Sequence, residues 1–469
     1  MLLTDLLGPV RTRGTTLPLE GVDVVDLAYD SRRVVPGALF CCVPGLATDG
    51  HDHAVDAAAR GAVALLVERP VAVELPQAVV GSVRAAMGPI ADRLFGAPSA
   101  ELAVLAVTGT NGKTTTAYLQ HAILTAAGLP AGLLGTVERR IGGVAEPAGR
   151  TTQEAIDLHR DLRRMVEAGD RACAMEVSSH ALDQDRVGGV RFAAAAFTNL
   201  TRDHLDYHPD MEAYFAAKAR LFDGRCPRAA NADDAYGRRL EAEVRFALDE
   251  PSAEVRAEDV RLGPDGSELR LRSPWGDADV RLRLVGRFNV ENALAAAATA
   301  GLAGIGLDAI RTGLASLSGV PGRMQVVGTR PAVIIDYAHT PDALATVLAT
   351  VRPLATGRVI CVFGCGGDRD RGKRPEMARA ACAGADRVLV TSDNPRSEDP
   401  DAIIADVMAG AAPNAAIEAD RATAIRRAIA EAGPDDVVVV AGKGHEQGQE
   451  AGGVVTPFDD AAVAREALA

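Results

Sequence analysis

The sequence predicts an α/β protein built from three domains. A chain of 469 residues is too long for one compact core. From about residue 100 onward, short apolar runs alternate with helical patterns and end in glycine-rich or charged turns, which is typical of mainly parallel sheets. We expect a small N-terminal α/β domain over 1–98, a central domain with a phosphate-binding loop over 99–323, and a Rossmann-like doubly wound domain over 324–469.

The composition excludes several classes of protein. The chain is 48% hydrophobic and 24% charged, as ordinary globular proteins are. Its net charge of -13 argues against nonspecific nucleic-acid binding, and a nucleotide site would need local positive charge. We find no run of about twenty apolar residues and no signal peptide, so no membrane span is expected. Seven scattered cysteines without zinc-type spacing fit a reducing compartment, and we expect a cytoplasmic protein.

The first hundred residues combine short β-like runs with a helical pattern. Residues 38–43 and 62–67 are predicted strands, and 53–60 is a predicted helix. A segment with glycine, proline and serine at 95–99 marks the expected domain boundary. This part of the chain is therefore expected to form a small α/β unit of its own.

The most informative stretch lies at 107–116. An apolar run at 102–107 leads into the turn Gly-Thr-Asn-Gly-Lys-Thr at 109–114, and a helical pattern follows at 117–124. The glycines allow a tight turn whose N–H groups face an anion, and the helix N-terminus adds partial positive charge. Strand, glycine turn and helix in this order predict a phosphate-binding loop.

Two side chains of this turn fit such a loop. Lys113 can reach the terminal phosphates of a nucleotide, and the Thr114 hydroxyl suits Mg²⁺. The strict pattern has a glycine five residues before Gly112, where this chain has Val107, so the loop is a shortened variant. A glycine turn whose lysine is merely solvated is the alternative.

Two further predicted strands of the central domain, 172–177 and 193–197, end in polar segments. Glu176 closes the first strand and is a hard oxygen ligand suited to Mg²⁺, although a simple capped helix is the alternative. The second strand is followed by Asp203, His204, Asp206 and His208. Zinc is one interpretation of this cluster. The absence of a thiolate and of a helical His-x-x-x-His face favours a Mg²⁺–ATP site that uses one imidazole.

Lys218 lies in an otherwise apolar helical pattern at 214–220. By composition alone, an ordinary solvated lysine is the expected interpretation. Composition therefore gives Lys218 no chemical role.

The last third of the chain repeats the pattern of strands and polar turns. Its predicted strands are 332–336, 359–363, 387–391 and 437–441. Charged turns follow three of them, at 364–374, 392–400 and 442–446. Because the carboxyl ends of parallel strands lie at one edge of a sheet, we expect these turns to face one cleft.

These segments together resemble the Mur ligase family, the ATP-dependent enzymes that form peptide bonds in peptidoglycan precursor synthesis. The resemblance covers essentially the whole chain. It rests on the turn at 109–114, the strand end at Glu176, and the segments 199–204, 286–294, 321–324 and 336–339.

Within the family, the chain is similar to the branch that adds the third amino acid. Asp-Ser-Arg at 30–32 and Asp-Gly-His at 49–51 resemble the UDP-binding domain of that branch, and Asp-Asn-Pro-Arg at 393–396 resembles the form that selects meso-diaminopimelate. A guanidinium binds the second carboxylate of diaminopimelate bidentately and repels the ammonium of lysine. The resemblance implies a monomer that acts on two small molecules, UDP-MurNAc-L-Ala-D-Glu and meso-diaminopimelate.

The resemblance also implies a role for each matching position. The ATP-binding set is Gly109, Thr110, Asn111, Gly112, Lys113, Thr114, Thr115, Asn292, Arg323 and Asp336. The UDP-muramoyl-dipeptide set is Ser31, Thr151, Thr152, Ser178, Gln184 and Arg186. The diaminopimelate set is Arg369, Asp393, Asn394, Pro395, Arg396, Gly442 and Glu446. Two Mg²⁺ ions are expected on Thr114, Glu176, His204 and a carbamate formed from Lys218 and CO₂, and the expected catalytic residues are Lys113, Lys218 and His204.

Two departures from the family pattern are visible. Gln153 stands where proline is usual, and it is expected to loosen the loop over the dipeptide. Gln325 stands where glutamate is usual, and it is expected to affect packing on the nucleotide side. Neither change removes a chemical group that the reaction needs.

Two alternative functions differ from a diaminopimelate ligase. One is another member of the superfamily, such as a folylpolyglutamate synthetase or a ligase for a different amino acid; the UDP-type first domain and the 393–396 segment argue against it. The other is a noncatalytic ATP-dependent binding protein. The joint presence of Lys113, Glu176, His204 and Lys218 argues against that alternative.

Overall fold

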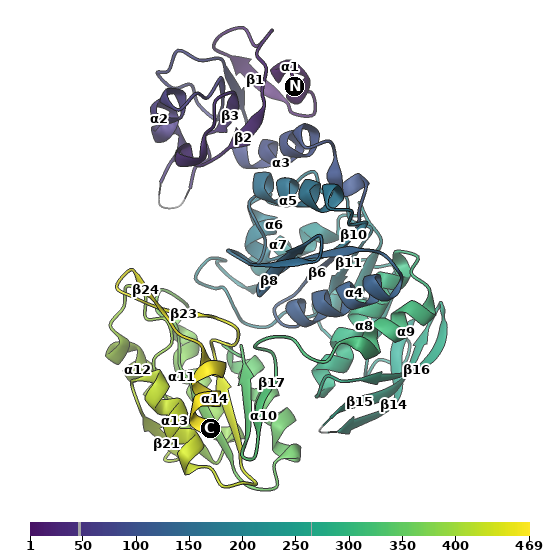
Figure 1. Ribbon diagram of the computed structural model, residues 1–469, viewed down its shortest axis with the longest axis vertical. Helices are drawn as coiled ribbons and strands as arrows, with labels where there is room; N and C mark the ends of the chain where they lie inside the picture. Colours follow the sequence, from purple (N-terminus) through teal and green to yellow (C-terminus); the bar gives the residue numbers. More distant parts are fainter. Residues whose placement is uncertain (46–47, 264) are drawn as a thin grey trace. The chain divides into compact units, whose positions relative to one another are not determined.

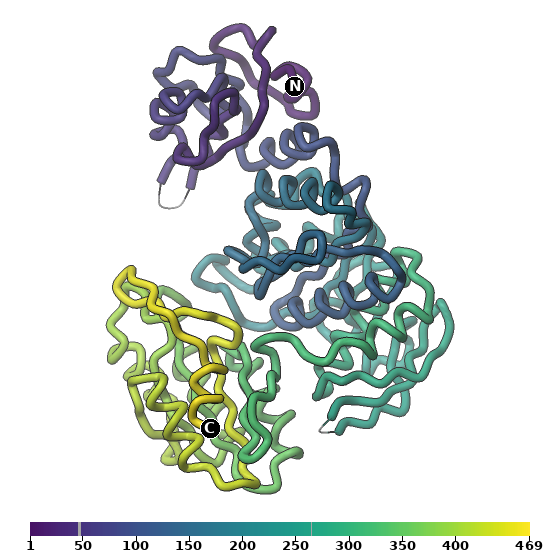
Figure 2. Tube along the Cα trace, in the orientation of Figure 1, coloured from purple at the N-terminus to yellow at the C-terminus, as the bar shows by residue number. Residues whose placement is uncertain are grey.

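The computed structural model describes residues 1–45, 48–263 and 265–469 (Figure 1). The chain, which Figure 2 traces from end to end, divides into two compact units. The first unit comprises 1–108, 128–195 and 217–227, and the second comprises 109–127, 196–216 and 228–469. The predicted boundaries near residues 98 and 323 stay predictions. No helix within the described residues combines the length and apolar character that crossing a membrane requires.

The N-terminal part of the first unit is a five-stranded sheet in the order β1-β5-β4-β3-β2. Strands β2 to β5 pair in parallel, and β1 is antiparallel to β5. Its elements are α1 (Leu3–Leu6), β1 (Thr12–Thr15), β2 (Asp26–Ala28), β3 (Ala38–Cys41), α2 (Ala54–Ala59), β4 (Ala64–Val67), β5 (Gln77–Val80) and α3 (Val83–Leu94). The strands and helix that we predict within the first hundred residues are confirmed as β3, β4 and α2.

The rest of the first unit places a buried parallel strand, β10, between β6 and β7. Every residue of β10 is buried, which explains why its sequence is a continuous apolar run up to Glu176. The elements here are β6 (Ala103–Thr108), β7 (Ala131–Leu134), β8 (Glu138–Ile141), β9 (Val144–Pro147), α5 (Ala155–Glu167), β10 (Ala172–Glu176) and α6 (Ser179–Asp183). Two elements continue from one unit into the other along the chain, β11 (Ala194–Phe197) and α7 (Met211–Ala219).

The second unit begins with α4, which packs against α8 and α9. Gly313 of α9 permits this approach, because a Cβ there would contact the Ile123 backbone of α4. The elements are α4 (Lys113–Ala126), β12 (Arg228–Asn231), β13 (Val244–Ala247), β14 (Val255–Gly263), β15 (Gly266–Ser273), β16 (Gly276–Leu282), α8 (Arg287–Leu302) and α9 (Leu307–Ser316). Strands β14, β15 and β16 are antiparallel, which the prediction of a mainly parallel sheet does not include.

The C-terminal part of the second unit is a six-stranded sheet in the order β17-β18-β22-β19-β20-β21, parallel except for β17. Its elements are β17 (Gln325–Thr329), β18 (Ala332–Asp336), α10 (Pro341–Val351), β19 (Val359–Phe363), α11 (Arg374–Gly384), β20 (Arg387–Val390), α12 (Pro400–Met408), β21 (Ala415–Ile417), α13 (Arg421–Glu431), β22 (Val437–Ala441), β23 (Gly448–Ala451), β24 (Val454–Pro457) and α14 (Asp460–Leu468).

Both faces of this sheet are buried. Cys361 and Phe363 of β19 pack with α10, α11 and α12, whereas the intervening Ile360 and Val362 pack with α13 and α14. Alternate residues of a strand point to opposite faces, so a strand covered on both sides must be apolar throughout. The doubly wound pattern that we predict from the sequence is confirmed, as are the predicted strands β18, β19, β20 and β22.

A fully buried ion pair fixes the carboxyl end of this sheet. The Arg421 guanidinium donates to both carboxylate oxygens of Asp460, at 2.8 and 2.7 Å, and neither side chain is exposed. Arg421 also donates to the Ala441 carbonyl at the end of β22 and to the Ser392 carbonyl after β20. One guanidinium therefore holds together the turns that follow two strands.

We expect Arg421→Met to lower the free energy of unfolding by about 3–5 kcal/mol, because it leaves the Asp460 carboxylate buried without its cation. Denaturant titration measures this loss. The matched control is Arg426→Gln on the same helix, whose pair with Glu466 is 50% and 70% exposed and should contribute little. Equal losses in the two variants would contradict the role given to the buried pair.

Candidate active site

The turn between β6 and α4 has the backbone geometry of an anion-binding loop. Gly109 and Gly112 have φ angles of 151° and 87°, in the region that favours glycine. A Cβ on Gly109 would collide with the Thr198 hydroxyl, and one on Gly112 would collide with the Asn292 amide oxygen. Helix α4 begins at Lys113, so the first N–H groups of the helix lack carbonyl partners within it and can bind an anion.

A neighbouring segment braces this turn. The Thr110 N–H donates to the Asn199 carbonyl (2.8 Å), and the Asn111 N–H donates to the Asn199 side-chain oxygen (2.9 Å). The Thr198 hydroxyl donates to the Asn111 carbonyl (2.6 Å). The turn is therefore held in shape by the segment that follows β11.

The predicted phosphate-binding side chains lie at this turn. The Lys113 ammonium donates to the carbonyls of Gly109 and Thr110, at 2.9 and 2.8 Å. Thr114 and Thr115 are buried in the first turn of α4. A lysine folded over its own loop carries its charge at the place where phosphates would bind.

Arg323 and Asp336 are also predicted nucleotide contacts. The Arg323 guanidinium donates to the Thr114 hydroxyl (3.1 Å), and its carbon lies 4.3 Å from the centre of the Tyr337 ring. The Asp336 carboxylate accepts the N–H groups of Met324 and Ala338, at 2.7 and 2.8 Å. Burial raises the pKa of Asp336, although Arg323 and these two amides oppose the shift.

The remaining residues around the turn have structural contacts. Asn292 on α8 lies behind Gly112, and its amide accepts from the Thr116 hydroxyl at 3.5 Å. Gln325, one of the two departures from the family pattern, accepts the Gly322 N–H at 2.9 Å. The Gln325 side chain thus supports the turn that carries Arg323.

The acidic and histidine cluster after β11 is organised around Asp203. This carboxylate lies 3.5 Å from the imidazoles of both His204 and His339 and 3.8 Å from the Lys373 ammonium. Burial alone would raise the pKa of Asp203, but these partners outweigh it and hold the pKa well below its usual value. His208 stacks on Tyr214 instead. In the part of the chain that the structure describes, no group of three or more His, Cys, Asp and Glu side chains is arranged to hold a metal ion.

In the first unit, Glu176 ends β10 as predicted. Its carboxylate accepts the N–H and the hydroxyl of Thr136, at 2.7 and 3.0 Å. The Thr136 hydroxyl lies 3.0 Å from that of Thr151. Thr136 is not among the residues predicted from the sequence, although it follows a glycine after the apolar run that forms β7.

Four of the predicted dipeptide residues, Thr152, Ser178, Gln184 and Arg186, lie together in the first unit. The Thr152 hydroxyl accepts the Ser178 N–H at 3.0 Å, and Ser178 caps α6. Arg186 donates to the Thr152 carbonyl (3.2 Å) and to the Gln184 side chain (2.7 Å). Glu154, which is not among the residues predicted from the sequence, pairs with Arg186 at 3.1 Å. The other departure, Gln153, donates to the Arg150 carbonyl at 3.3 Å.

Lys218 is buried on α7, with 1% of its surface exposed. The interpretation from composition, an ordinary solvated lysine, is therefore wrong. Composition misleads here because lysines are mostly exposed in proteins, whereas this one is buried by the packing around α7.

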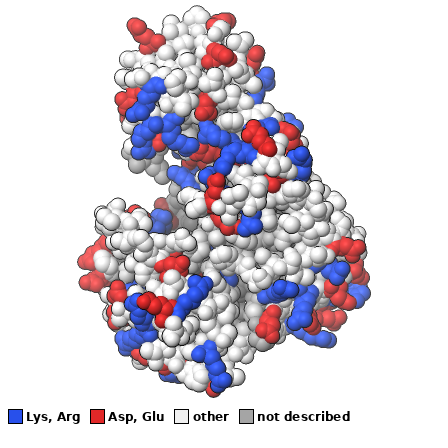
Figure 3. All heavy atoms as spheres, viewed as in Figure 1, with Lys and Arg blue, Asp and Glu red and all other residues white. Residues whose placement is uncertain are grey.

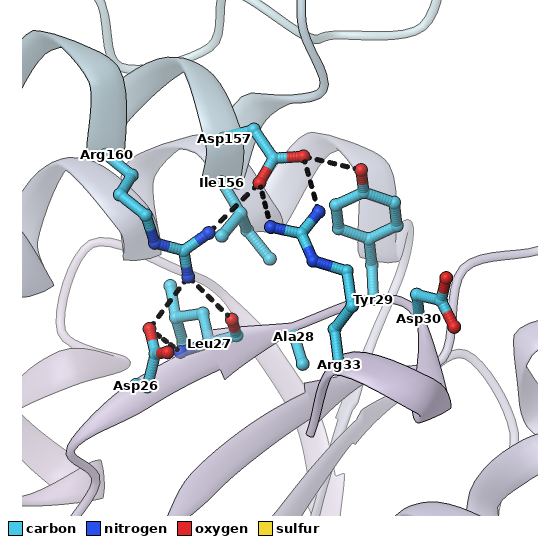
Figure 4. Close-up of a pocket in the computed structure, with 9 residues that line it drawn as sticks. All are labelled: Asp26, Leu27, Ala28, Tyr29, Asp30, Arg33, Ile156, Asp157 and Arg160. Carbon is cyan, nitrogen blue, oxygen red and sulfur yellow. Dashed lines mark hydrogen bonds and ion pairs between the residues drawn. The ribbon is translucent and has the colours of Figure 1, made fainter. Parts of the chain in front are cut away.

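The Asp-Ser-Arg segment forms a short 3-10 helix at Ser31–Arg33, capped by the Asp30 carboxylate. Beside it lies a pocket of about 130 Å³, shown in Figure 4. The Asp157 carboxylate accepts from Tyr29 (2.6 Å) and Arg33 (3.1 and 3.2 Å) there. Arg160 bridges Asp157 and Asp26, at 3.0 and 2.8 Å. The predicted contact Ser31 is the first residue of this 3-10 helix, and it is buried.

In the C-terminal sheet, the turns after β19, β20 and β22 meet. A Cβ on Gly366 would lie 2.9 Å from Arg396 Nη1 and 3.9 Å from Arg369 Cγ. A Cβ on Gly442 would lie 2.7 Å from the Asp393 carboxylate. Gly367 packs directly on the Pro395 carbonyl. The structure thus brings the predicted amino-acid-binding residues of three separate turns into one place.

The charged side chains of these turns have defined partners. Arg396 Nη1 donates to the Gly367 carbonyl (2.6 Å), and Arg369 donates to the Asp368 carbonyl (2.9 Å). The Asn394 amide donates to the Glu446 carboxylate (2.8 Å). Lys443 also donates to both Asn394 and Glu446. It is not among the residues predicted from the sequence, because a lysine between two glycines is a weak signal.

The surface carries charges of both signs. On the face drawn in Figure 3, basic and acidic side chains are intermixed. The net charge is -13, and Lys113 and Arg323 place two cationic side chains at the glycine turn.

A glycine turn with lysine at the start of a helix, on an α/β sheet, defines a phosphate-loop protein of the nucleotide-dependent type. Three family models match the chain: the Mur ligase family catalytic domain over 24–93, the Mur ligase middle domain over 107–300, and the Mur ligase glutamate ligase domain over 322–444. The chain belongs to the Mur ligase family. The family and the three-domain α/β fold that we predict from the sequence are thereby confirmed.

Close relatives share one name, UDP-N-acetylmuramoyl-L-alanyl-D-glutamate--2,6-diaminopimelate ligase. The protein of that name from Geobacillus kaustophilus is 47% identical over 95% of both chains. The one from Gloeobacter violaceus is 46% identical over 100% of this chain and 98% of its own. A solved structure of a ligase of the same name has a TM-score of 0.71 and 35% identity, and it covers 100% of this chain. MurF from Acinetobacter baumannii, at 21% identity and a TM-score of 0.65, shares the fold.

We expect Lys113→Ala to lower phosphate release from ATP by about three orders of magnitude, because the ammonium stabilises charge on the transferred phosphoryl group. The control is Thr125→Ala near the far end of α4, whose hydroxyl donates to the His121 carbonyl within the helix. Phosphate release near the normal rate by folded Lys113→Ala would show that this turn does not bind the reacting phosphates.

Proposed function

We propose that this chain joins meso-diaminopimelate to the D-glutamate γ-carboxylate of UDP-MurNAc-L-Ala-D-Glu, with hydrolysis of ATP to ADP, in peptidoglycan precursor synthesis. The observation that carries the proposal is the meeting of the 393–396 turn with those at 366–369 and 442–446. It gathers guanidinium, amide and carboxylate groups, which an amino acid with two charged ends requires. The similarity to relatives named for this reaction supports the same conclusion.

The reaction needs an activated carboxylate. A carboxylate is a poor electrophile until one of its oxygens becomes a good leaving group. The γ-carboxylate of D-glutamate attacks the terminal phosphorus of ATP, which gives an acyl phosphate and ADP. The amine of diaminopimelate then attacks the acyl carbon, and the tetrahedral intermediate collapses to an amide and inorganic phosphate.

The phosphate loop provides most of the electrostatic stabilisation of the phosphoryl group. Lys113 and the N–H groups at the start of α4 bind the transferred phosphoryl group and stabilise its charge in the transition state. Arg323, which is held against Thr114, adds a second cation on the nucleotide side. His204 follows Asp203, whose ion pairs fix this part of the chain.

The donor set fits Mg²⁺, since Thr114 and Glu176 offer the hard oxygens that this ion prefers. We propose that Thr114, Glu176, His204 and a carbamate on Lys218 hold two Mg²⁺ ions. Bound Mg²⁺ supplies neutralisation of the charge on ATP and the carboxylate. Lys218 is buried, and a carbamate formed from its amine and CO₂ would offer oxygen ligands to the metal there.

The first unit binds the UDP-muramoyl dipeptide in this proposal. Ser31 lies at the UDP end, and the linked side chains of Thr152, Ser178 and Arg186 hold the dipeptide. Thr151 and Gln184 contribute to the same set. We also propose that the enzyme acts as a cytoplasmic monomer with domains near 1–98, 99–323 and 324–469.

The amino-acid pocket would select diaminopimelate by its second carboxylate. We propose that Arg396 and Arg369 bind carboxylates and that Glu446 binds an amine, while Asp393, Asn394, Pro395 and Gly442 shape the pocket. Lysine lacks the second carboxylate and would leave Arg396 desolvated without a counter-charge.

Phosphate release with purified protein tests the proposed function. The assay contains ATP, Mg²⁺ and UDP-MurNAc-L-Ala-D-Glu, and it compares meso-diaminopimelate, lysine and no amine. We expect release that depends on both the dipeptide and diaminopimelate. Release that depends on a different amine would make the chain a ligase for that amino acid, and dependence on none would support a noncatalytic or ATPase role.

We expect Lys218→Ala to be nearly inactive and to regain part of its activity with acetate or another short carboxylate, which replaces the carbamate oxygens. The matched control is Arg220→Ala, whose exposed side chain pairs with Asp185 and should show no response to acetate. A crystal structure of the active enzyme with an ATP analogue, Mg²⁺ and an unmodified Lys218 would count against the carbamate.

We expect Arg396→Ala to raise the Michaelis constant for diaminopimelate about a hundredfold, because the ion pair between the guanidinium and the second carboxylate of the substrate is lost. The Michaelis constant for ATP should stay the same. Steady-state kinetics with diaminopimelate and lysine side by side measure the change. Arg371→Ala, which removes an exposed arginine paired with Glu398, is the control. If Arg396→Ala kept the preference for diaminopimelate over lysine, the assignment of the amino-acid substrate would be wrong.

A further inference from the structure

Lys443 is a fully buried cation beside the proposed amino-acid pocket. Its side chain has 0% exposure. It lies in the turn after β22, between Gly442 and Gly444, whose φ angles of 112° and 56° favour glycine. A lysine is rarely buried unless its ammonium has partners. The partners of Lys443 therefore indicate what the charge does.

The Lys443 ammonium closes a triangle of hydrogen bonds. It donates to the Asn394 side-chain oxygen at 2.8 Å and to Glu446 Oε2 at 3.1 Å. Asn394 in turn donates its amide N–H to the same Glu446 oxygen at 2.8 Å. An amide can satisfy an ammonium and a carboxylate together only with its oxygen toward the first and its nitrogen toward the second. Lys443 thus fixes the orientation of Asn394.

Further contacts extend the triangle to the rest of the pocket. The Asn394 oxygen also accepts the Glu450 N–H at 3.0 Å, and Asp393 Oδ1 lies 3.8 Å from the ammonium. Both bonds to Glu446 go to Oε2. Within the described residues, Oε1 accepts no hydrogen bond, and the side chain is 31% exposed. Glu446 therefore keeps one oxygen for a ligand while the other is held.

We propose that Lys443 is a positioning residue for the amino-acid substrate: its ammonium holds Asn394 and Glu446 so that Glu446 Oε1 faces the amine of diaminopimelate. The inference rests on the proposed function, and it adds a residue that does not itself touch the substrate. Lys443 also offsets the negative charge of Asp393 and Glu446, so that the pocket accepts a zwitterion and does not simply attract cations.

The opposite side of the same turn faces the nucleotide-binding residues. A Cβ on Gly444 would lie 2.8 Å from the Tyr337 side chain, and the His445 ring centre lies 5.3 Å from that of Tyr337, over which Arg323 stacks. Lys443 points to Asn394 instead. Loss of the ammonium should therefore change diaminopimelate binding and leave ATP binding unaffected.

A double-mutant cycle with Lys443→Met and Glu446→Gln in the full-length enzyme tests the inference. Lys443→Met keeps the length and removes the charge. We expect the Michaelis constant for diaminopimelate to rise about tenfold to a hundredfold, because Asn394 and Glu446 lose a buried partner, with those for ATP and the UDP-dipeptide unchanged. The double variant should be no worse than the more impaired single variant. A role in stability alone would not produce this coupling.

The matched control is Arg358→Gln, which removes a cation from the opposite end of the same sheet, where Arg358 bonds to Asp436 at 2.8 Å. It should leave all three Michaelis constants unchanged. Thermal unfolding checks that each variant is folded, and Lys443→Gln, which retains a donor amide, is the second variant if Lys443→Met does not fold.

Several results would overturn the inference. The first is a normal Michaelis constant for diaminopimelate in Lys443→Met. The second is a double variant whose fold-change in that constant equals the product of the two single fold-changes. The third is failure of both Lys443 variants to fold. Wild-type enzyme that forms no product with diaminopimelate would instead overturn the proposed function, so the two failures are distinguishable.

Discussion

The site depends on backbone turns at strand ends that only glycine permits without strain. At Gly112 the backbone is left-handed, and the Asn292 side chain occupies the space that a Cβ would need. These two constraints fix the direction in which the following N–H groups of α4 point. The same constraint applies at Gly442, where the Asp393 carboxylate occupies the space of a Cβ. Because parallel strands end at a common edge, each such turn delivers its functional groups to a predictable place.

The C-terminal sheet carries two sets of paired polar and charged side chains. The Arg421–Asp460 pair is fully buried and ties strand ends to each other, so it serves the fold. The side chains of Lys443, Asn394 and Glu446 form a second set that is joined by hydrogen bonds, and within the described residues one Glu446 carboxylate oxygen accepts none. The fully paired Arg421 and Asp460 side chains rigidify the strand ends, and this helps Lys443, Asn394 and Glu446 to keep a fixed geometry.

Much of the fold and of the candidate site could be predicted from the sequence, and the features that could not be predicted have physical reasons. The buried strands β10, β19 and β22 are continuous apolar runs with a polar turn after them, and the phosphate loop adds fixed spacing, so both were predicted. The antiparallel strands β14 to β16 were not, although alternating residues in β15 carry a period-two signal. Burial of Lys218 and Lys443 was missed because it arises from tertiary packing, which neither residue type nor spacing reveals. Pairs such as Asp203 with His339 join segments far apart in the chain.

The most direct test of the reaction follows oxygen atoms. The substrate is UDP-MurNAc-L-Ala-D-Glu with ¹⁸O in both γ-carboxylate oxygens, incubated with the enzyme, ATP, Mg²⁺ and meso-diaminopimelate. If the carboxylate is activated as an acyl phosphate, mass spectrometry will find one ¹⁸O in the released phosphate and the other in the new amide. Phosphate without label, formed together with the amide product, would contradict activation of the carboxylate by phosphoryl transfer.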